Sequence, residues 1–316
     1  MRLRRLGRTG LDVSELTIGT ATLATLASDM REASAALALA LELGVNAVEI
    51  DAGDRDAASL LGAILRREGA RNQVHVIARA SSLVRFDLPS PHVPAQQAYP
   101  GAHIRAETET LLAILGVERL ALQQLHAFCP EWRGEGDWHE TFERLRAEGK
   151  IAGFGVSLFD HDVEAGLEIA ASGTIDAVEV MYNIFDQSAA TALLPLCQGH
   201  GVGVIARSPL YFGALASSRG GDMRDFPPED WRSAYFFDAH RRETEERVRR
   251  LAHEVEPPDR SLSDLALRFC LSHPAVSTVA VGMRTREQVE ANIEALRHGS
   301  LDASKCASLA GHKWLS

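Results

Sequence analysis

Short apolar runs alternate with amphipathic helical stretches along most of the chain, and this alternation constrains the fold more than any other feature. The helical stretches often end at a glycine such as Gly44, Gly116 or Gly149, which is a common helix stop. Eight apolar runs have the character of buried strands: 16–19, 47–50, 74–78, 120–125, 153–156, 177–181, 202–206 and 276–281. Eight parallel strands that alternate with helices predict a closed (β/α)8 TIM barrel, an α/β fold.

The remaining segments extend this barrel without suggesting a second domain. We expect residues 1–316 to form a single domain, because this length suits one barrel. The segment before the first strand is expected to form an N-terminal β-hairpin, and helices are expected at the C-terminal end. Two stretches interrupt the alternation: 80–101, which is rich in proline, and 211–242, which is rich in aromatic side chains. Loops this long are lids, substrate loops or disordered segments, and we place both over the barrel mouth.

A doubly wound open sheet is the alternative fold, but the sequence offers little for it. Its Gly-x-Gly-x-x-Gly turn follows a strand and opens a helix. The glycine-rich run 199–203 precedes a strand instead, so it is more simply interpreted as a helix-to-strand turn.

Composition and charge argue against several kinds of partner. The net charge is −10 and the basic residues do not form an arm, which argues against a nucleic-acid face or an anionic-membrane anchor. No apolar run reaches the roughly 18 residues of a membrane-spanning helix, and no secretory signal is visible. The four cysteines are scattered, and no ligand spacing predicts a metal site. These features indicate a cytoplasmic protein, with the oligomeric state left open.

Polar side chains stand at or near the ends of the predicted strands. In such a barrel the active site lies where the strands end, so these residues are candidates by position. They are Thr20, Asp51, Arg79, His126, Ser157, Glu179, Arg207, Ser208, Gly282 and Arg284. One such residue could be an ordinary core polar group, but the whole set favours a functional site.

Several longer motifs occur in a recognisable order. Residues 51–57 are similar to an Asp-Thr-Ala-x-x-Tyr-Gly pattern. Further matching segments are 5–14, Gln124-Leu-His126, 148–157, Tyr182-Asn183-Ile-Phe185, Ser208-Pro-Leu210 and 287–292. Together these motifs resemble the aldo-keto reductase superfamily almost from end to end. The resemblance implies a barrel enzyme that reduces carbonyl groups with NADP(H).

The catalytic positions of that family are altered in this chain. The family uses a tetrad of tyrosine, lysine, aspartate and histidine, in which the tyrosine gives a proton to the carbonyl and the lysine lowers its pKa. The resemblance places Asp56 at the tyrosine position and Arg79 at the lysine position, while Asp51 and His126 are retained. None of the three lysines of the chain is placed to replace the missing one. The substituted tetrad predicts a divergent member with a rebuilt active site.

The implied cofactor site is altered mainly on its nicotinamide side. The family positions that bind the carboxamide and stack on the ring hold Leu158, Glu179 and Arg207 here. Glu179 and Arg207 follow neighbouring strands and could pair with each other. The adenosine side matches better, and Arg284 suits a 2′-phosphate. The candidate cofactor residues are Thr20, Ser157, Glu179, Arg207, Ser208, Leu210, Gly282, Arg284, Gln288 and Asn292.

The substituted residues change what protons can do at the site. Arg79 stays protonated, so it can hold charge but cannot shuttle protons, and we expect Asp51 to be its partner. Asp56 is then a second carboxylate near one cation. It could be a general acid with a raised pKa, or an aspartate that faces the positive end of a helix. His126 is the better acid–base candidate because an imidazole titrates near neutral pH.

Three functions compete on this sequence. The favoured hypothesis is a redox-silent acid–base reaction, such as dehydration, isomerisation or a lyase step, on a small oxygenated metabolite. The second is an NADP(H)-dependent carbonyl or aldehyde oxidoreductase with a different proton donor, for which Tyr99 and Tyr211 are candidates. The third is a non-catalytic binding or regulatory protein. In the first two cases the partner is a small molecule, either anionic or carbonyl-bearing.

Overall fold

Eight parallel strands close into a barrel, as the sequence predicts. The structure is a computed structural model that describes residues 1–21, 30–70, 73–84, 93–216, 226, 230–256 and 258–315. Neighbouring strands pair in chain order and the last pairs with the first. In that order they are β3 (Leu16–Gly19), β4 (Ala47–Asp51), β5 (His75–Ala80), β6 (Leu122–His126), β7 (Phe154–Ser157), β8 (Ala177–Met181), β9 (Gly203–Arg207) and β10 (Val276–Gly282).

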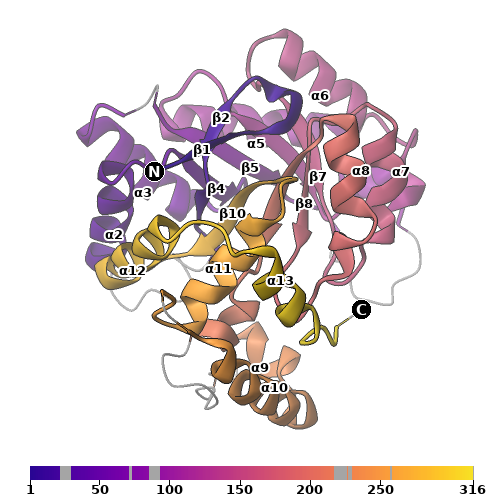
Figure 1. The fold of residues 1–316 in the computed structure, drawn as a ribbon. Coiled ribbons are helices and arrows are strands. Elements are labelled where there is room, and N and C mark those ends of the chain that lie inside the picture. Colours follow the sequence, from indigo (N-terminus) through magenta and orange to yellow (C-terminus); the bar gives the residue numbers. More distant parts are fainter. Residues whose placement is uncertain are drawn as a thin grey trace.

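Helices surround the strands, as Figure 1 shows. They are α2 (Met30–Glu42), α3 (Arg55–Arg67), α4 (Ala95–Ala98), α5 (Gly101–Leu115), α6 (Trp138–Ala147), α7 (Leu167–Ala171), α8 (Leu193–His200), α9 (Trp231–Tyr235), α10 (Asp238–Leu251), α11 (Leu262–Ser272), α12 (Arg286–Arg297) and α13 (Ala303–Ala310). Short 3-10 turns are η1 (Gly7–Thr9), η2 (Pro130–Trp132), η3 (Glu164–Gly166), η4 (Ser188–Ala190), η5 (Tyr211–Ala216) and η6 (Ala252–Glu254).

Local sequence explains where α3 begins and which face it buries. The Asp54 side chain accepts a hydrogen bond from the backbone N–H of Ala57 at 2.9 Å, and so satisfies one of the free donors of the first turn. Its apolar side chains recur every three or four residues, and Ala57, Leu61 and Leu65 are buried. The predicted strand and helix boundaries elsewhere differ from the structure by one or a few residues, as expected where helix ends fray and strand pairing sets the limits.

The N-terminal hairpin closes the end of the barrel opposite the strand ends. Strands β1 (Leu3–Arg5) and β2 (Asp12–Ser14) pair antiparallel. Leu6 and Val13 pack in one buried cluster with inward side chains of the strands: Ala47, Ile77, Leu122, Ala177, Ile205 and Ala280. Gly7 has φ +50°, and a Cβ there would lie 2.2 Å from the carbonyl oxygen of Asp176, so the close approach requires glycine. The carboxyl ends of the strands remain for the functional site.

The two expected long loops are only partly described. Residues 85–92 of the first loop, and 217–225 and 227–229 of the second, lie outside the described residues. The second segment is more regular than expected, because it contains η5, α9 and the start of α10. Its ring-to-ring contacts, such as Phe212 with Trp231 at 4.8 Å between centroids, explain how a segment read as a loop packs into helical turns.

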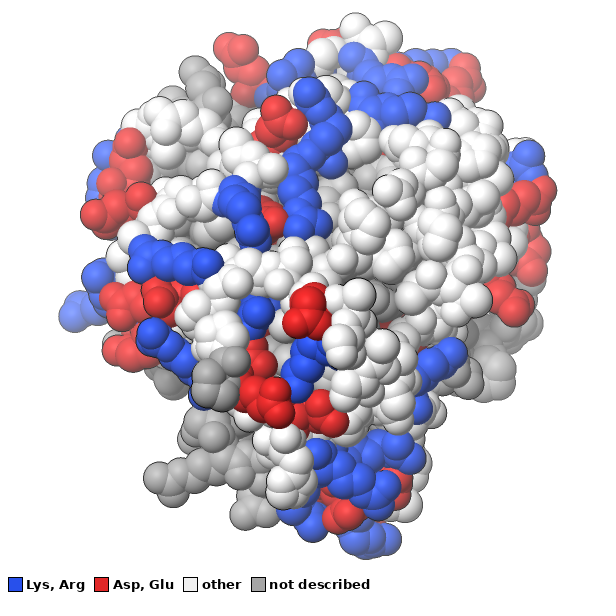
Figure 2. Space-filling view, viewed as in Figure 1, with Lys and Arg blue, Asp and Glu red and all other residues white. Residues whose placement is uncertain are grey.

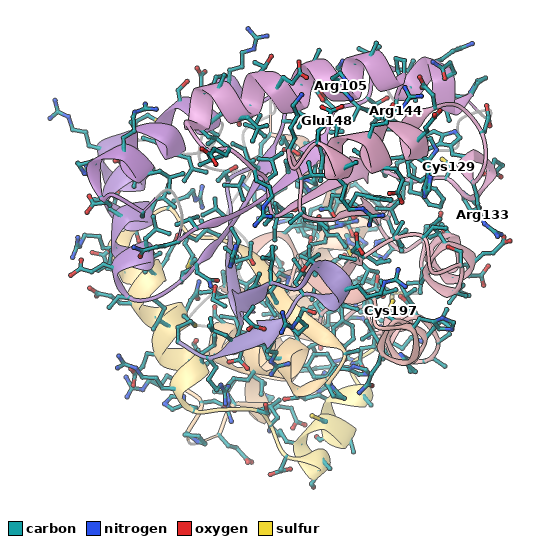
Figure 3. The ribbon with its side chains drawn as sticks, turned by 90° about the horizontal axis from the view of Figure 1, so that it is seen from above. Arg105, Cys129, Arg133, Arg144, Glu148 and Cys197 are labelled. Atoms are coloured by element: carbon teal, nitrogen blue, oxygen red, sulfur yellow. The ribbon has the colours of Figure 1, made fainter. Side chains whose placement is uncertain are left out.

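The surface charge and the cysteines give little further indication of function. Acidic and basic side chains are interspersed over the face in Figure 2. All four cysteines are free, and Cys129 and Cys197 lie on separate elements (Figure 3). In the described part of the chain, no helix has both the length and the apolar content to cross a membrane.

Candidate active site

Strand register brings the polar strand-end residues into two adjoining rows. Asp51 of β4 lies in register with Arg79 of β5, and Arg79 lies in register with Gln124 of β6. In the next strands His126 is aligned with Ser157, and Ser157 with Glu179. Because parallel strands of a closed barrel end at the same face, these side chains converge at the mouth.

Arg79 is the centre of this cluster. Its Nε and Nη2 donate to the two carboxylate oxygens of Asp51 at 2.8 and 3.1 Å, a bidentate pair. Its Nη1 donates to Glu179 at 3.4 Å, and Glu49 lies 3.5 Å from Nε. The Arg79 side chain is only 11% exposed, so these carboxylates, and not water, neutralise its charge.

Glu49 and Glu179 form a buried carboxyl pair whose pKa values are shifted in opposite directions. Burial raises the pKa of Glu49 well above its usual value, and Arg79 only partly opposes this. Burial also acts on Glu179, but Arg79 and the hydrogen bond from Glu49 outweigh it, so the pKa of Glu179 is lowered. Gln124 donates a further hydrogen bond to Glu179. Of the two carboxyl groups, Glu49 therefore holds a proton more readily than Glu179.

Arg207 forms the expected ion pair with Glu179 only at long range, and its shorter contacts are elsewhere. Their closest approach is 3.9 Å, whereas Arg207 Nη1 lies 2.5 Å from Asp160 and its Nη2 donates to the backbone oxygen of Leu158 at 2.8 Å. The long side chain reaches the loop after β7, where a partly exposed carboxylate is available. Glu179 is instead held by Arg79, Gln124 and Glu49.

His126 is a neutral imidazole at physiological pH. Burial, assisted by the nearby charge of Arg79, lowers its pKa to about 4. Its Nδ1 lies 3.1 Å from Ser157 Oγ. The expected titration near neutral pH is therefore wrong, because a buried imidazole next to a guanidinium resists a second positive charge.

Asp56 is not a neighbour of Arg79. It lies exposed in the first turn of α3, two residues after the capping Asp54. Among the described residues, the carboxylates within ion-pair distance of Arg79 belong to Asp51, Glu49 and Glu179. The position corresponds to the second of the two expectations, an aspartate at the positive end of a helix.

The two expected substitute proton donors are buried. The Tyr99 hydroxyl donates to the backbone oxygen of His126, and Tyr211 contacts His240 Nε2 at 2.7 Å. Burial raises the pKa of both phenols. Neither ring is exposed at all, so neither can swing over the mouth. The loop position suggested exposure, but large aromatic rings gain most by burial.

Sequence reasoning missed Glu49 and Asp160. A signal for Glu49 was present, because it precedes Asp51 by two residues on the same strand and alternate residues face the same side. Asp160 gave no such signal, since its role depends on how far the Arg207 side chain reaches. Gln124 was quoted within a motif without a role, yet it is fully buried and holds Glu179.

The candidate cofactor residues occupy one side of the mouth. Thr20 is 2% exposed and its buried Oγ1 has no hydrogen-bond partner among the described residues, as is also true of Arg207 Nε. Gly282 ends β10 and precedes Arg284, whose backbone N–H donates to Gln288 at 2.8 Å. The remaining positions are Ser157 on β7, Ser208 and Leu210 after β9, and Gln288 and Asn292 on α12.

These residues fit part of NADP(H). The Thr20 hydroxyl and Arg207 Nε are buried donors without a hydrogen-bond partner among the described residues, and α12 begins close to Arg284, where a helix N-terminus attracts phosphate. Arg207 could stack its planar guanidinium on a neutral reduced nicotinamide, but it would repel the cationic oxidised ring. The start of α12 therefore suits a phosphate group, while the ends of β8 and β9 carry the charged side chains of Glu179 and Arg207. In the described residues, no group of three or more His, Cys, Asp or Glu is arranged to hold a metal ion.

Comparison with known proteins identifies the family. Residues 15–313 match the aldo/keto reductase family, so the chain belongs to it. It is 27% identical over 316 residues, 99% of this chain and 96% of the relative, to an uncharacterised oxidoreductase, YqkF, of Bacillus subtilis. It is 25% identical to a pyridoxal 4-dehydrogenase of Microbacterium luteolum, over 92% of this chain and 91% of the relative. The holo form of aldo-keto reductase AKR11C1 from Bacillus halodurans superposes with a TM-score of 0.77 at 27% identity, covering 100% of this chain and 97% of that one.

Proposed function

We propose that the protein is an NADP(H)-dependent oxidoreductase that interconverts a carbonyl group and an alcohol on a small molecule. Several relatives that match almost the whole chain are named oxidoreductases or dehydrogenases, which supports this reaction over the redox-silent one that the sequence favours. The observation that carries the proposal is the buried imidazole of His126, with its lowered pKa and its contact with Ser157. A neutral imidazole whose Nδ1 accepts from Ser157 Oγ–H presents Nε2–H as a donor, and such a donor can polarise a carbonyl oxygen.

The other residues of the cluster would support this role electrostatically. Arg79 is a fixed cation beside His126 and would stabilise negative charge that develops on the carbonyl oxygen. Asp51 holds the guanidinium through both of its oxygens and fixes its orientation. Asp160 similarly holds Arg207. Because these charges are already in place, they need no reorganisation during the reaction.

Cofactor binding would rest on the side of the mouth that carries Thr20, Ser157, Ser208, Leu210, Gly282, Arg284, Gln288 and Asn292. When bound, a reduced nicotinamide would supply the hydride. Arg284, which follows β10 directly, is suited to a 2′-phosphate, which is why we propose NADP(H) over NAD(H). We further propose that the protein acts in the cytoplasm on a small carbonyl compound that the cations Arg79 and Arg207 help to bind.

A redox-silent acid–base reaction is the second candidate, and one observation favours it. The Arg207–Asp160 ion pair stands on the side of the mouth where a nicotinamide ring would be expected to stack. The protonated Glu49 beside Glu179 is also a stored proton of the kind that dehydration or isomerisation uses. This candidate requires that the chain turn over a substrate without any dinucleotide.

Thermal shift with NADPH, NADP⁺, NADH and NAD⁺ separates the two candidates. A ligand at ~100 times its dissociation constant stabilises a protein by roughly 2.7 kcal/mol, which corresponds to a shift of a few degrees at most for a chain this long. We expect a shift with NADPH, followed by its oxidation in the presence of a panel of aldehydes and ketones. Absence of a shift with all four nucleotides would remove the oxidoreductase.

A further inference from the structure

Tyr235 is the one tyrosine of the four in the chain that is not buried. It ends α9, in the long segment between β9 and α10. Its ring is held edge-on by Phe212 at 4.8 Å and lies 6.0 Å from Trp231, which is itself 54% exposed. The ring is therefore fixed in direction by its neighbours, while part of the residue remains exposed to solvent.

A chain of hydrogen bonds connects this phenol to a buried carboxylate. The Tyr235 hydroxyl lies 3.0 Å from His161 Nε2, and His161 Nδ1 lies 2.7 Å from Asp186 Oδ2. Asp186 is fully buried, and its other oxygen accepts from Ser188 N at 3.1 Å and Ser188 Oγ at 2.5 Å. Since a carboxylate can only accept, His161 donates from Nδ1 and presents Nε2 to the phenol.

The phenol belongs to the same mouth as the Arg79 cluster. Asp160, which directly precedes His161, forms the 2.5 Å ion pair with Arg207 at the end of β9. Arg207 Nε lies 3.9 Å from Glu179, which also pairs with Arg79 at 3.4 Å. A continuous series of contacts therefore connects the Tyr235 hydroxyl, through His161 and the adjacent Asp160, to the Arg79 cluster.

The backbone around this chain of hydrogen bonds is held in uncommon conformations. His161 has φ +63° and Tyr211 has φ +44°, and Ser208 and Phe212 next to them also have positive φ. Such positions cost on the order of 1–3 kcal/mol each and persist where surrounding structure holds them, often at functional sites. His161, Tyr211 and Phe212 each contact Tyr235 directly.

We propose that Tyr235, His161 and Asp186 form the proton relay of this enzyme, in which Tyr235 replaces the phenol that is missing from α3 and donates a proton to the carbonyl oxygen of the substrate. The proposal rests on the proposed oxidoreductase function. It assigns Tyr235 as the catalytic residue that touches substrate, and His161 and Asp186 as the residues that supply and orient its proton.

The proton balance of the step follows from the contacts. Asp186 holds His161 through Nδ1, which keeps Nε2 directed at the Tyr235 oxygen. As the carbonyl carbon receives hydride from the reduced dinucleotide, the Tyr235 O–H bond breaks and an O–H bond forms on the substrate. The phenolate then regains a proton from water by way of His161 Nε2, the atom that contacts it. In the net reaction, the carbonyl compound, the hydride and one proton from water combine to give the alcohol.

A second phenol supports Tyr235 from the other side. The hydroxyl groups of Tyr211 and Tyr235 are 3.1 Å apart, so Tyr211 can donate to a phenolate at Tyr235. Burial and the charges of Asp160 and Asp186 raise the pKa of Tyr235 to about 12, while the Tyr211 hydrogen bond opposes them. The phenol therefore carries its proton at neutral pH, as a general acid must.

Matched phenol deletions test the proposal by activity. Tyr235→Phe should lower kcat/KM for carbonyl reduction ~100-fold or more, the contribution of a general acid, while the dissociation constant for NADPH stays within twofold. His161→Asn removes the proton donor and suits the positive φ of this position, and it should lower kcat/KM by a comparable factor. The control is Tyr182→Phe, which removes the same atom from a ring packed against Phe269 outside the barrel.

A second readout needs neither cofactor nor substrate. In protein labelled with ¹³C at the tyrosine Cζ, the resonance that vanishes in Tyr235→Phe should shift in His161→Asn, whereas the Tyr182 resonance should not. If the Tyr235 resonance has the same chemical shift in His161→Asn as in the wild type, the relay is overturned, even if the wild type is inactive. Wild-type turnover that survives Tyr235→Phe also overturns the relay but leaves the oxidoreductase intact. Failure of every nucleotide to bind counts against the oxidoreductase, and the resonance shift then decides the relay alone.

Discussion

Arg79 and Asp51 face each other directly across neighbouring strands, and both guanidinium–carboxylate hydrogen bonds of the pair form, at 2.8 and 3.1 Å. This pair stands where the family tetrad has a lysine and an aspartate. Because a guanidinium keeps its proton, the pair supplies a rigid charge and leaves proton transfer to other groups.

Removal of Arg79 should unfold the site. Arg79→Ala leaves Asp51, Glu49 and Glu179 without their shared cation, and breaking a buried pair costs about 3–5 kcal/mol. The matched control is Arg105→Ala. Arg105 makes a bidentate pair with Glu148 at 2.7 Å on the surface between α5 and α6 (Figure 3), and exposed pairs are worth roughly 1 kcal/mol or less. Chemical denaturation measures both, and equal losses would contradict the central role of Arg79.

Glu49→Gln should stabilise the protein increasingly as pH rises. The folded pKa of Glu49 is raised, chiefly by burial, so the folded state keeps a proton that the unfolded state loses above about pH 4.5. Wild-type stability is therefore lost as pH rises toward the folded pKa, by up to roughly 1.4 kcal/mol per pH unit. Glutamine mimics the protonated acid and escapes this loss. Urea unfolding of both proteins at pH 5 and pH 8 measures the difference, and a difference that does not grow with pH would show that Glu49 is ionised.

His126→Gln should remove a loss of stability at acidic pH. In the folded state the pKa of His126 is lowered to about 4 by burial and by Arg79. Between about pH 6.5 and pH 4 the imidazole is therefore protonated in the unfolded state but not in the folded state. Wild-type stability therefore falls as pH drops from about 6.5 to about 4, by on the order of 3 kcal/mol in total. The variant should not show this component. Unfolding free energies of the two proteins at pH 4.5 and pH 7 provide the test; parallel pH profiles would mean that the imidazole titrates freely.

Asp54 and Asp56 should differ sharply despite their proximity. Asp54→Ala removes the cap of α3 and should cost about 0.5–2 kcal/mol. Asp56→Ala removes an exposed side chain in the first turn and should change stability by no more than about 0.5 kcal/mol. We also expect Asp56→Ala to keep carbonyl turnover. Loss of turnover in Asp56→Ala with an unchanged fold would reinstate Asp56 as the general acid.

The barrel and the position of its mouth could be predicted from the amino-acid sequence alone. Apolar runs with the length of strands, helical periodicity between them and glycine stops are local patterns, and eight repeats of such a unit leave one closed arrangement. The strand-end positions of Asp51, Arg79, Glu179 and Arg207 follow from the same reasoning, since parallel strands all end at one face.

Only the tertiary structure decided which of these groups pair and which ionise. Arg207 turns to Asp160, Glu49 keeps a proton beside Glu179, Tyr99 and Tyr211 are buried, and Tyr235 meets His161. These outcomes depend on the reach of flexible side chains and on how fully each group is withdrawn from water. Neither quantity is encoded by local pattern, because segments far apart in the sequence, such as those of His161 and Tyr235, supply the two partners of each contact.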